Sequence, residues 1–203
     1  MKTLLLLAAC LATPALAAPI PLVDTSFRDG DGHRVQQLQI DIDAPVAKVW
    51  AAFTTDAGFT SWAAPVARVT LGNDGMIEAS YSLKSKIGDP DNIRNRIVAY
   101  LPERLLIIHN EHVPKGAPFK PEAIEKIRTI MQFEDLGHGR TRVTESGVGY
   151  GEGKDFDEMY AHFRDGNAEE FESLAQSFKT GPVDWKAEAE EMKASVEKAP
   201  SSR

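Results

Sequence analysis

The stretch from Phe156 to Phe178 constrains the fold more than any other part of the sequence. Its apolar residues recur from Met159 onward at steps of three or four, with one gap at residues 166–167. This spacing predicts a long helix with a single apolar stripe. The run Lys179-Thr180-Gly181-Pro182 follows, which is typical of a helix end because glycine readily adopts positive φ and proline cannot continue the helix. Such a helix needs an apolar surface to cover.

Seven segments before this helix have the composition and alternation of β-strands, and turn residues separate them. Tight turns are indicated at Asn73-Asp74-Gly75 and at Gly137-His138-Gly139. The segment 104–113 is apolar on both faces, which favours a central position in a sheet. The expected strands are residues 35–43, 65–71, 76–83, 92–100, 104–113, 126–136 and 140–150.

Two short helices are predicted between the first and second of these strands. Asp43 is a candidate N-cap for the first helix, whose apolar stripe runs from Val46 to Phe53. The second follows around Phe59 to Ala63. Hairpin-connected strands with helices set apart in the sequence predict an α+β fold with an antiparallel sheet of about six to seven strands.

The N-terminus has the pattern of an export signal. Lys2 precedes an apolar run, and Ala15-Leu16-Ala17 supplies small residues before a cleavage point after Ala17 or Ala18. We therefore expect a signal peptide over 1–17, an N-terminal extension over 18–34 and a periplasmic or secreted protein. An alternative is a lipoprotein, since Leu7-Ala8-Ala9-Cys10 fits a lipobox that would place a lipid on Cys10, the only cysteine.

The charge of the chain argues against two classes of partner. The formal net charge is −7 and no block of Lys and Arg interrupts it. Nucleic-acid binding requires a basic face that neutralises phosphates, so we expect no nucleic-acid partner. The apolar run near the N-terminus is too short to span a membrane, so we also expect no membrane span.

Several dispersed segments together resemble a known family. They are Ile42-Asp43-Ala44-Pro45 leading into Val49-Trp50, then Trp62, Leu101-Pro102-Glu103-Arg104-Leu105, Thr141 to Gly147, and Gly181-Pro182-Val183-Asp184-Trp185. In order and spacing the chain resembles the START-like helix-grip superfamily (SRPBCC), in the group related to the C-terminal domain of the Hsp90 ATPase activator. The resemblance covers roughly residues 35–185.

This resemblance implies a curved antiparallel sheet that grips the C-terminal helix over residues 35–181, with a cavity between them. It also implies that the function is binding a small apolar or amphipathic molecule. Some members are enzymes and others are co-chaperones, and the fold alone does not choose among these. Activation of Hsp90 is not carried over, because an exported protein would meet neither Hsp90 nor ATP.

Ten residues are candidates for the lining of such a cavity. Most are aromatic or sulfur-containing side chains, which adapt to irregular ligands. Their simplest alternative role is to fill a solid core. The candidates are Trp50, Phe53, Trp62, Tyr81, His109, Met131, Phe133, Glu145, Phe163 and Asn167.

Glu145 is the candidate best suited to act as an acid or a base. It shares a strand face with Val143, so if Val143 points inward Glu145 does too, and burial would raise the pKa of its carboxyl. An enzyme would use it as an acid or base together with His109 or Tyr81. The alternative is a solvated position at the rim of the sheet, paired with Arg94 or Arg96.

No motif in the sequence identifies a catalytic centre, a metal site or a cofactor site. His109 and Glu111 share a strand face and could contribute two ligands to a metal, but two such residues on a strand often occur without one. We find no trustworthy Ser-His-Asp order, no His-Glu-x-x-His and no nucleophile elbow. The sequence therefore leads us to expect no cofactor and assigns no catalytic residue.

The tail over 182–203 contains a thin apolar stripe from Trp185 to Val196 within a Lys- and Glu-rich segment. This pattern predicts a helix. Either the helix docks on the domain, or it is the binding site for a protein partner.

Overall fold

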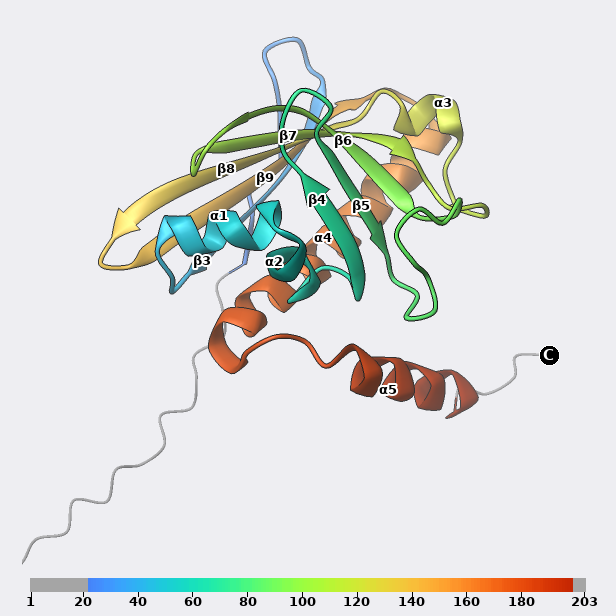
Figure 1. Ribbon diagram of the computed structural model, residues 1–203. Helices are drawn as coiled ribbons and strands as arrows, with labels where there is room; N and C mark the ends of the chain where they lie inside the picture. The colour runs from blue at the N-terminus through green and yellow to red at the C-terminus, as the bar shows by residue number, and fades with distance from the viewer. Residues whose placement is uncertain (1–21, 199–203) are drawn as a thin grey trace, which may run out of the picture.

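A computed structural model describes residues 22–198. The expected signal peptide and its cleavage site, the candidate lipid attachment at Cys10 and the last five residues lie outside this range. The fold is α+β: a curved, unclosed antiparallel sheet and a long C-terminal helix that lies against it (Figure 1). The predicted fold class is confirmed.

The sheet has nine strands, more than the six to seven we expected. The strands run in the order β1-β3-β9-β8-β7-β6-β5-β4, and β2 also pairs with β3. Their bounds are β1 Val23–Asp24, β2 Phe27–Arg28, β3 Arg34–Ile42, β4 Val66–Thr70, β5 Met76–Ser80, β6 Ile93–Leu101, β7 Leu105–His112, β8 Arg128–Gly137 and β9 Arg140–Tyr150.

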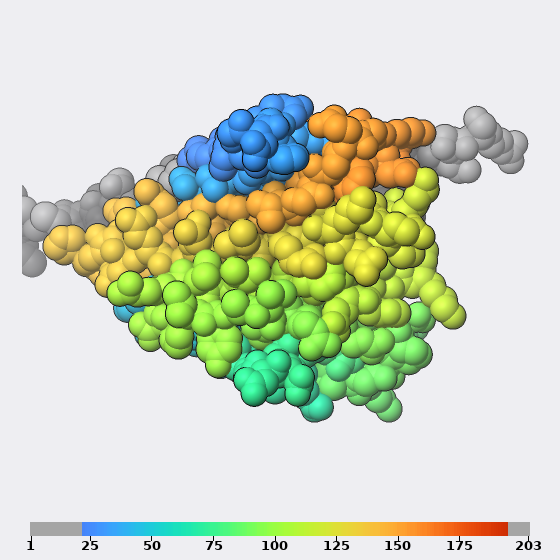
Figure 2. All heavy atoms as spheres, turned by 90° about the horizontal axis from the view of Figure 1, so that it is seen from above, coloured from blue at the N-terminus to red at the C-terminus, as the bar shows by residue number. Residues whose placement is uncertain are grey.

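The two additional strands, β1 and β2, lie in the segment expected to be an extension. Each is two residues long and pairs with β3 in antiparallel register. Figure 2 shows this N-terminal segment (blue) beside the first part of the long helix (orange). Arg34 at the start of β3 joins the two parts, because its Nη1 lies 2.6 Å from Asp157 Oδ1.

Consecutive strands from β4 to β9 pair in antiparallel register, and turns join all of them except β7 and β8, which a longer segment containing α3 connects. In the β8–β9 turn, Gly137, His138 and Gly139 all have positive φ, at 74°, 55° and 72°. Such backbone angles suit the tight turns whose twist matches that of paired strands. β7 lies in the interior of the sheet, as its apolar character on both faces predicted.

Over residues 22–198, five helices complete the fold: α1 Val46–Thr54, α2 Asp56–Thr60, α3 Pro121–Ile124, α4 Lys154–Thr180 and α5 Trp185–Lys198. The predicted cap of α1 was wrong. Pro45 occupies the N-cap position without a side-chain hydrogen bond, and Asp43 lies exposed outside the helix. The predicted end of α4 is confirmed, since Gly181 has a φ of 96° and its N–H bonds Ser177 O at 3.0 Å.

The core is divided along α4. Residues from the second half of the helix, Phe171, Leu174 and Ala175, pack into the main core with Trp50 and Phe133. Residues from the first half pack into a second cluster, in which Met159 is fully buried with Ile124, Ile127 and Tyr150 as neighbours. In the middle of α4, Phe163 packs at the edge of the second cluster and Ala168 at the edge of the main core.

The start of the tail is docked on the domain. The backbone N–H of Val183 bonds Ser61 O at 3.0 Å, and Trp185 Nε1 donates to Thr60 O at 2.7 Å. α5 then runs past the segment Tyr81–Lys84, on one side of the domain (Figure 1). Within residues 22–198, no helix is both long and apolar enough to cross a membrane.

Candidate functional site

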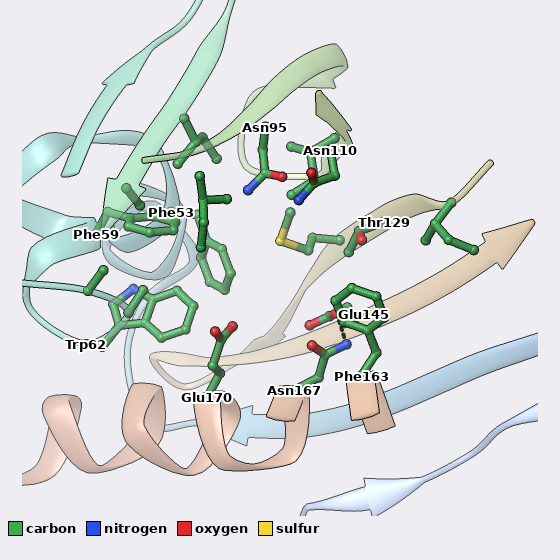
Figure 3. Close-up of a pocket in the computed structure, with 18 of the residues that line it drawn as sticks. Phe53, Phe59, Trp62, Asn95, Asn110, Thr129, Glu145, Phe163, Asn167 and Glu170 are labelled. Carbon is green, nitrogen blue, oxygen red and sulfur yellow. Dashed lines mark hydrogen bonds between the residues drawn. The ribbon is translucent and has the colours of Figure 1, made fainter. Parts of the chain in front are cut away.

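A cavity of about 180 Å³ lies between the middle of α4 and the sheet. The helix contributes Phe163, Asn167 and Glu170 to its lining, which fall on one helical face at steps of four and three (Figure 3). The remaining lining residues come from α1, from the segment around α2, from β5 to β9 and from the segment around α3. They are Phe53, Phe59, Trp62, Ala63, Ala64, Ile77, Ala79, Tyr81, Ile93, Asn95, Ile108, Asn110, Ile124, Ile127, Thr129, Met131 and Glu145.

Aromatic rings form much of the apolar wall. Phe53 and Trp62 lie with ring centroids 4.9 Å apart, and Phe59 contacts Trp62 at 5.6 Å. Trp62 is held in place because its Nε1 donates to Ala52 O at 2.9 Å. Phe163, which α4 supplies, stacks on Phe119 at 5.2 Å. The rings are thus fixed by contacts with one another and with Ala52 and Phe119 outside the lining.

Glu145 faces the cavity from β9. Val143, two residues earlier on the same face, is fully buried, and the Glu145 carboxyl accepts a hydrogen bond from Asn167 Nδ2 at 2.6 Å. The expected alternative, a rim position paired with Arg94 or Arg96, does not occur, because Arg96 pairs with Glu111. Asn167 Nδ2 also lies 3.4 Å from Oε1 of the buried Gln36.

Glu170 is a second carboxyl in the same cavity (Figure 3). Its Oε1 accepts a hydrogen bond from the Tyr81 hydroxyl at 2.6 Å. Tyr81 as a whole residue is 63% exposed, so it reaches from the surface into the site.

Both carboxyls have raised pKa values. Removal from water raises the pKa of Glu145 from 4.5 to about 8, and the charge of Glu170 adds to this effect. Burial also raises the pKa of Glu170, while the hydrogen bond from Tyr81 acts in the opposite direction. Glu145 is therefore largely protonated at neutral pH in the unliganded protein.

Seven of the ten candidate residues lie in the cavity lining: Phe53, Trp62, Tyr81, Met131, Glu145, Phe163 and Asn167. The other three do not. Trp50 and Phe133 pack against each other at 5.3 Å in the main core. His109 Nδ1 lies 2.8 Å from Arg128 Nη1 and 3.4 Å from Ile127 O.

The acid–base pair that we considered from the sequence is not formed in this arrangement. Tyr81 bonds Glu170 rather than Glu145, and His109 lies outside the lining. The candidate metal ligand Glu111 is paired with Arg96. Within the described part of the chain, no three His, Cys, Asp or Glu side chains are grouped so that they could hold a metal ion.

Four polar lining residues were missed in the sequence: Asn95, Asn110, Thr129 and Glu170. A signal existed for Glu170, since it lies seven residues after Phe163 and three after Asn167, on the same helical face. A weaker signal existed for Asn95, which shares a strand face with the buried Ile97. Asn110 is its direct partner in the β6–β7 register, and only the pairing reveals it.

A groove of about 610 Å³ lies outside the cavity, between the segment Tyr81–Lys84 and α5. Its lining includes Leu83, Trp185 and Met192. Tyr81 belongs to both linings, so it separates the groove from the cavity.

Comparison with known proteins places the chain in a family. The sequence profile described as "Polyketide cyclase / dehydrase and lipid transport" matches residues 34–180. The chain belongs to this family. Every residue that lines the cavity lies within the match. The polyketide cyclase / dehydrase and lipid transport family has a fold suited to hydrophobic ligands, and the predicted START-like resemblance is confirmed.

Solved structures show the same fold at low sequence identity. The Aha1 dimer from Colwellia psychrerythraea is 19% identical, with a TM-score of 0.57 over 72% of this chain and 97% of that one. CalU16 from Micromonospora echinospora is also 19% identical, with a TM-score of 0.55 over 89% of this chain and 93% of that one. The comparison with curated proteins finds no match.

Proposed function

We propose that this protein binds a small apolar or amphipathic molecule in the cavity between the sheet and α4. The observation that carries the proposal is a cavity of about 180 Å³ with aromatic walls and polar groups from both β9 and α4. Protein interiors normally pack as densely as organic crystals. The side chains between α4 and the sheet therefore leave room for a bound molecule, which would pack against the aromatic walls.

The proposed setting is the periplasm or the medium. Its support is the pattern of residues 1–17, with a basic start, an apolar run and small residues before the cleavage point. The intact mass of the protein purified from a bacterial host tests this. Export predicts a chain that starts at Ala18 or Pro19, a lipoprotein predicts a chain that starts at an acylated Cys10, and an uncleaved chain contradicts both.

Three tryptophans provide reporters for the binding test. Trp62 lines the cavity, Trp185 lines the groove beside α5, and Trp50 lies in the main core. Each indole N–H gives its own signal in a ¹⁵N–¹H NMR spectrum. On titration with phenol, indole or 2-phenylethanol, we expect saturable shifts centred on Trp62.

A cavity-filling variant supplies the matched control. Ala79→Leu places three additional carbons in the lining and should abolish the Trp62 shifts. Ala99→Leu makes the same change at an exposed position of β6 and should leave them intact. No saturable shift with any of the probes, or shifts centred on Trp185, would overturn the proposal.

Catalysis is a second candidate because the pKa of Glu145 is raised to about 8. A carboxyl that retains its proton at neutral pH is a potential general acid, and Glu170 in the same cavity offers a second acid or base. Mass spectrometry of the ligand recovered after incubation distinguishes the two functions. An unchanged mass supports binding, whereas a changed mass that Glu145→Gln prevents supports an enzyme.

A further inference from the structure

We propose that the ligand of this cavity is a small organic cation, in which a protonated amine is attached to a compact apolar body. This inference rests on the proposed binding function and adds the chemical class of the ligand. It follows from the hydrogen-bonding character of the polar lining atoms, from the absence of a basic group among them, and from the aromatic walls.

The two carboxyls each leave one oxygen free in the cavity, beside the amide and hydroxyl groups of Asn95, Asn110 and Thr129. Asn167 Nδ2 donates to one oxygen of Glu145, and the Tyr81 hydroxyl donates to one oxygen of Glu170. Among residues 22–198, no hydrogen bond engages the second oxygen of either carboxyl. A ligand with several N–H donors would satisfy these oxygens.

The charge of the lining also favours a cationic ligand. It contains two carboxyls and no Lys, Arg or His. Buried carboxyls are normally paired with a cation or bonded to several donors, because removing their charge from water is costly. Here the cationic partner is missing from the lining, and a protonated amine would supply it.

The apolar lining suits the rest of such a ligand. Phe53, Phe59, Trp62 and Phe163 present aromatic rings, which attract cations and pack against apolar groups. A cavity of about 150 Å³ can take up benzene. The volume of about 180 Å³ therefore favours a ligand of about one aromatic ring with a short amine arm.

Binding of a cation is coupled to release of a proton. Glu145, on β9, faces Glu170, which lies on α4. Tyr150, also on β9, is close enough to Glu145 to interact with it electrostatically. Glu170 faces Glu145 and Tyr81, and the lining residues of α1, β6, β7 and β8 are not titratable. The empty cavity retains a proton on Glu145, and the ligand's ammonium group displaces this proton to solvent.

Isothermal titration calorimetry with three probes of similar shape tests the inference: 2-phenylethylamine, 2-phenylethanol and 3-phenylpropionate, at pH 7.5. We expect the amine to bind at least about tenfold more tightly than the alcohol, since charge-assisted hydrogen bonds are about twice as strong as neutral ones. The carboxylate probe should not bind. The amine's affinity should rise between pH 6 and pH 8.5, and its binding heat should depend on the buffer because a proton is released.

Isosteric variants identify the groups responsible. Glu145→Gln and Glu170→Gln should each weaken amine binding by about tenfold and leave alcohol binding nearly unchanged. Glu169→Gln removes the same charge from an exposed neighbour on α4 and should alter neither. Equal or tighter binding of the alcohol, or preferred binding of the acid, would overturn the inference while the binding function stands. Failure of all three probes to bind the unaltered protein would overturn both.

Discussion

Glu145 and Glu170 are two acids in a cavity whose lining contains no base. Burial raises the pKa of both carboxyls, and the charge of Glu170 raises that of Glu145 further, so the folded protein retains protons that the unfolded chain would lose. This arrangement lowers stability at alkaline pH.

The first prediction concerns the pH dependence of stability. The pKa of Glu145 is about 8 in the folded protein against 4.5 ordinarily, so its contribution to the free energy of unfolding is largest below pH 4.5. That contribution falls as the pH rises toward 8, by about a few kcal/mol in total. Glu145→Gln should flatten this slope and be more stable than the unaltered protein above pH 8.

Urea denaturation between pH 5 and pH 9 measures this effect. Glu170 retains its own raised pKa in the variant, so part of the slope should persist. Glu169→Gln, on the exposed side of α4, should follow the unaltered protein at every pH. Parallel stability curves for Glu145→Gln and the unaltered protein would show that Glu145 is solvated.

A second prediction concerns Tyr81, whose hydroxyl donates to Glu170 at 2.6 Å. This bond favours the charged carboxylate and holds the pKa of Glu170 lower than burial alone would set it. Tyr81→Phe should therefore raise the pKa of Glu170 further. The ¹³C shift of the Glu170 carboxyl, followed against pH, measures this.

Tyr100→Phe is the matched control for Tyr81→Phe, because it removes a hydroxyl from a tyrosine that packs against Trp50 outside the cavity lining. It should leave the titration of Glu170 unchanged. A fall in the pKa of Glu170 in Tyr81→Phe would mean that the hydroxyl does not stabilise its charge.

Individual site residues were predictable only where a local pattern indicated the face on which they lie. Strand alternation related Glu145 to Val143, and the break in the apolar stripe drew attention to Asn167. Glu170 lies on the apolar face of α4. In the sequence it is one of several acidic residues between Glu169 and Glu172, so it does not stand out. Trp50 and Phe133 resemble cavity residues in the sequence, and only their mutual contact places them in solid core.

At the level of elements, α4 has three parts with different roles. Its first half packs on the α3 segment, its second half packs in the main core, and its middle presents polar groups to the cavity. The period of its apolar residues and the Gly181-Pro182 pair predicted both the helix and its end. β1 and β2 had no such signal, because a two-residue strand is defined by its pairing with β3 and not by its own sequence.

A third prediction concerns the docking of α5. Trp185 Nε1 bonds Thr60 O at 2.7 Å, and Trp185→Ala removes both this bond and the packing of the indole. We expect faster amide hydrogen exchange in residues 186–194 and a loss of roughly 1–2 kcal/mol in the free energy of unfolding. Lys186→Ala, at the exposed neighbouring position, should change neither.

Deletion of residues 184–203 separates docking from partner binding. A docked helix predicts a lower melting temperature for the truncated protein. A tail that serves only to bind a protein partner predicts an unchanged melting temperature together with loss of a partner in a pull-down. Unchanged hydrogen exchange in Trp185→Ala would contradict docking through the indole.

At the level of the whole molecule, the order of elements predicted the antiparallel α+β fold, and the family resemblance predicted the helix grip. The cavity could not be derived in the same way. Aromatic residues at helix and strand spacing are equally consistent with a filled core, and the curvature of the sheet decides which rings meet and which leave space. The polar groups of β6, β7, β9 and α4 converge only in three dimensions.

A crystal structure of the protein grown with 2-phenylethylamine tests the central claim most directly. We predict electron density for the ligand between α4 and the sheet, with its nitrogen within hydrogen-bond distance of Glu145 and Glu170 and its ring against Phe53 and Trp62. Density confined to the groove beside α5, or an empty cavity at saturating ligand, would contradict the account.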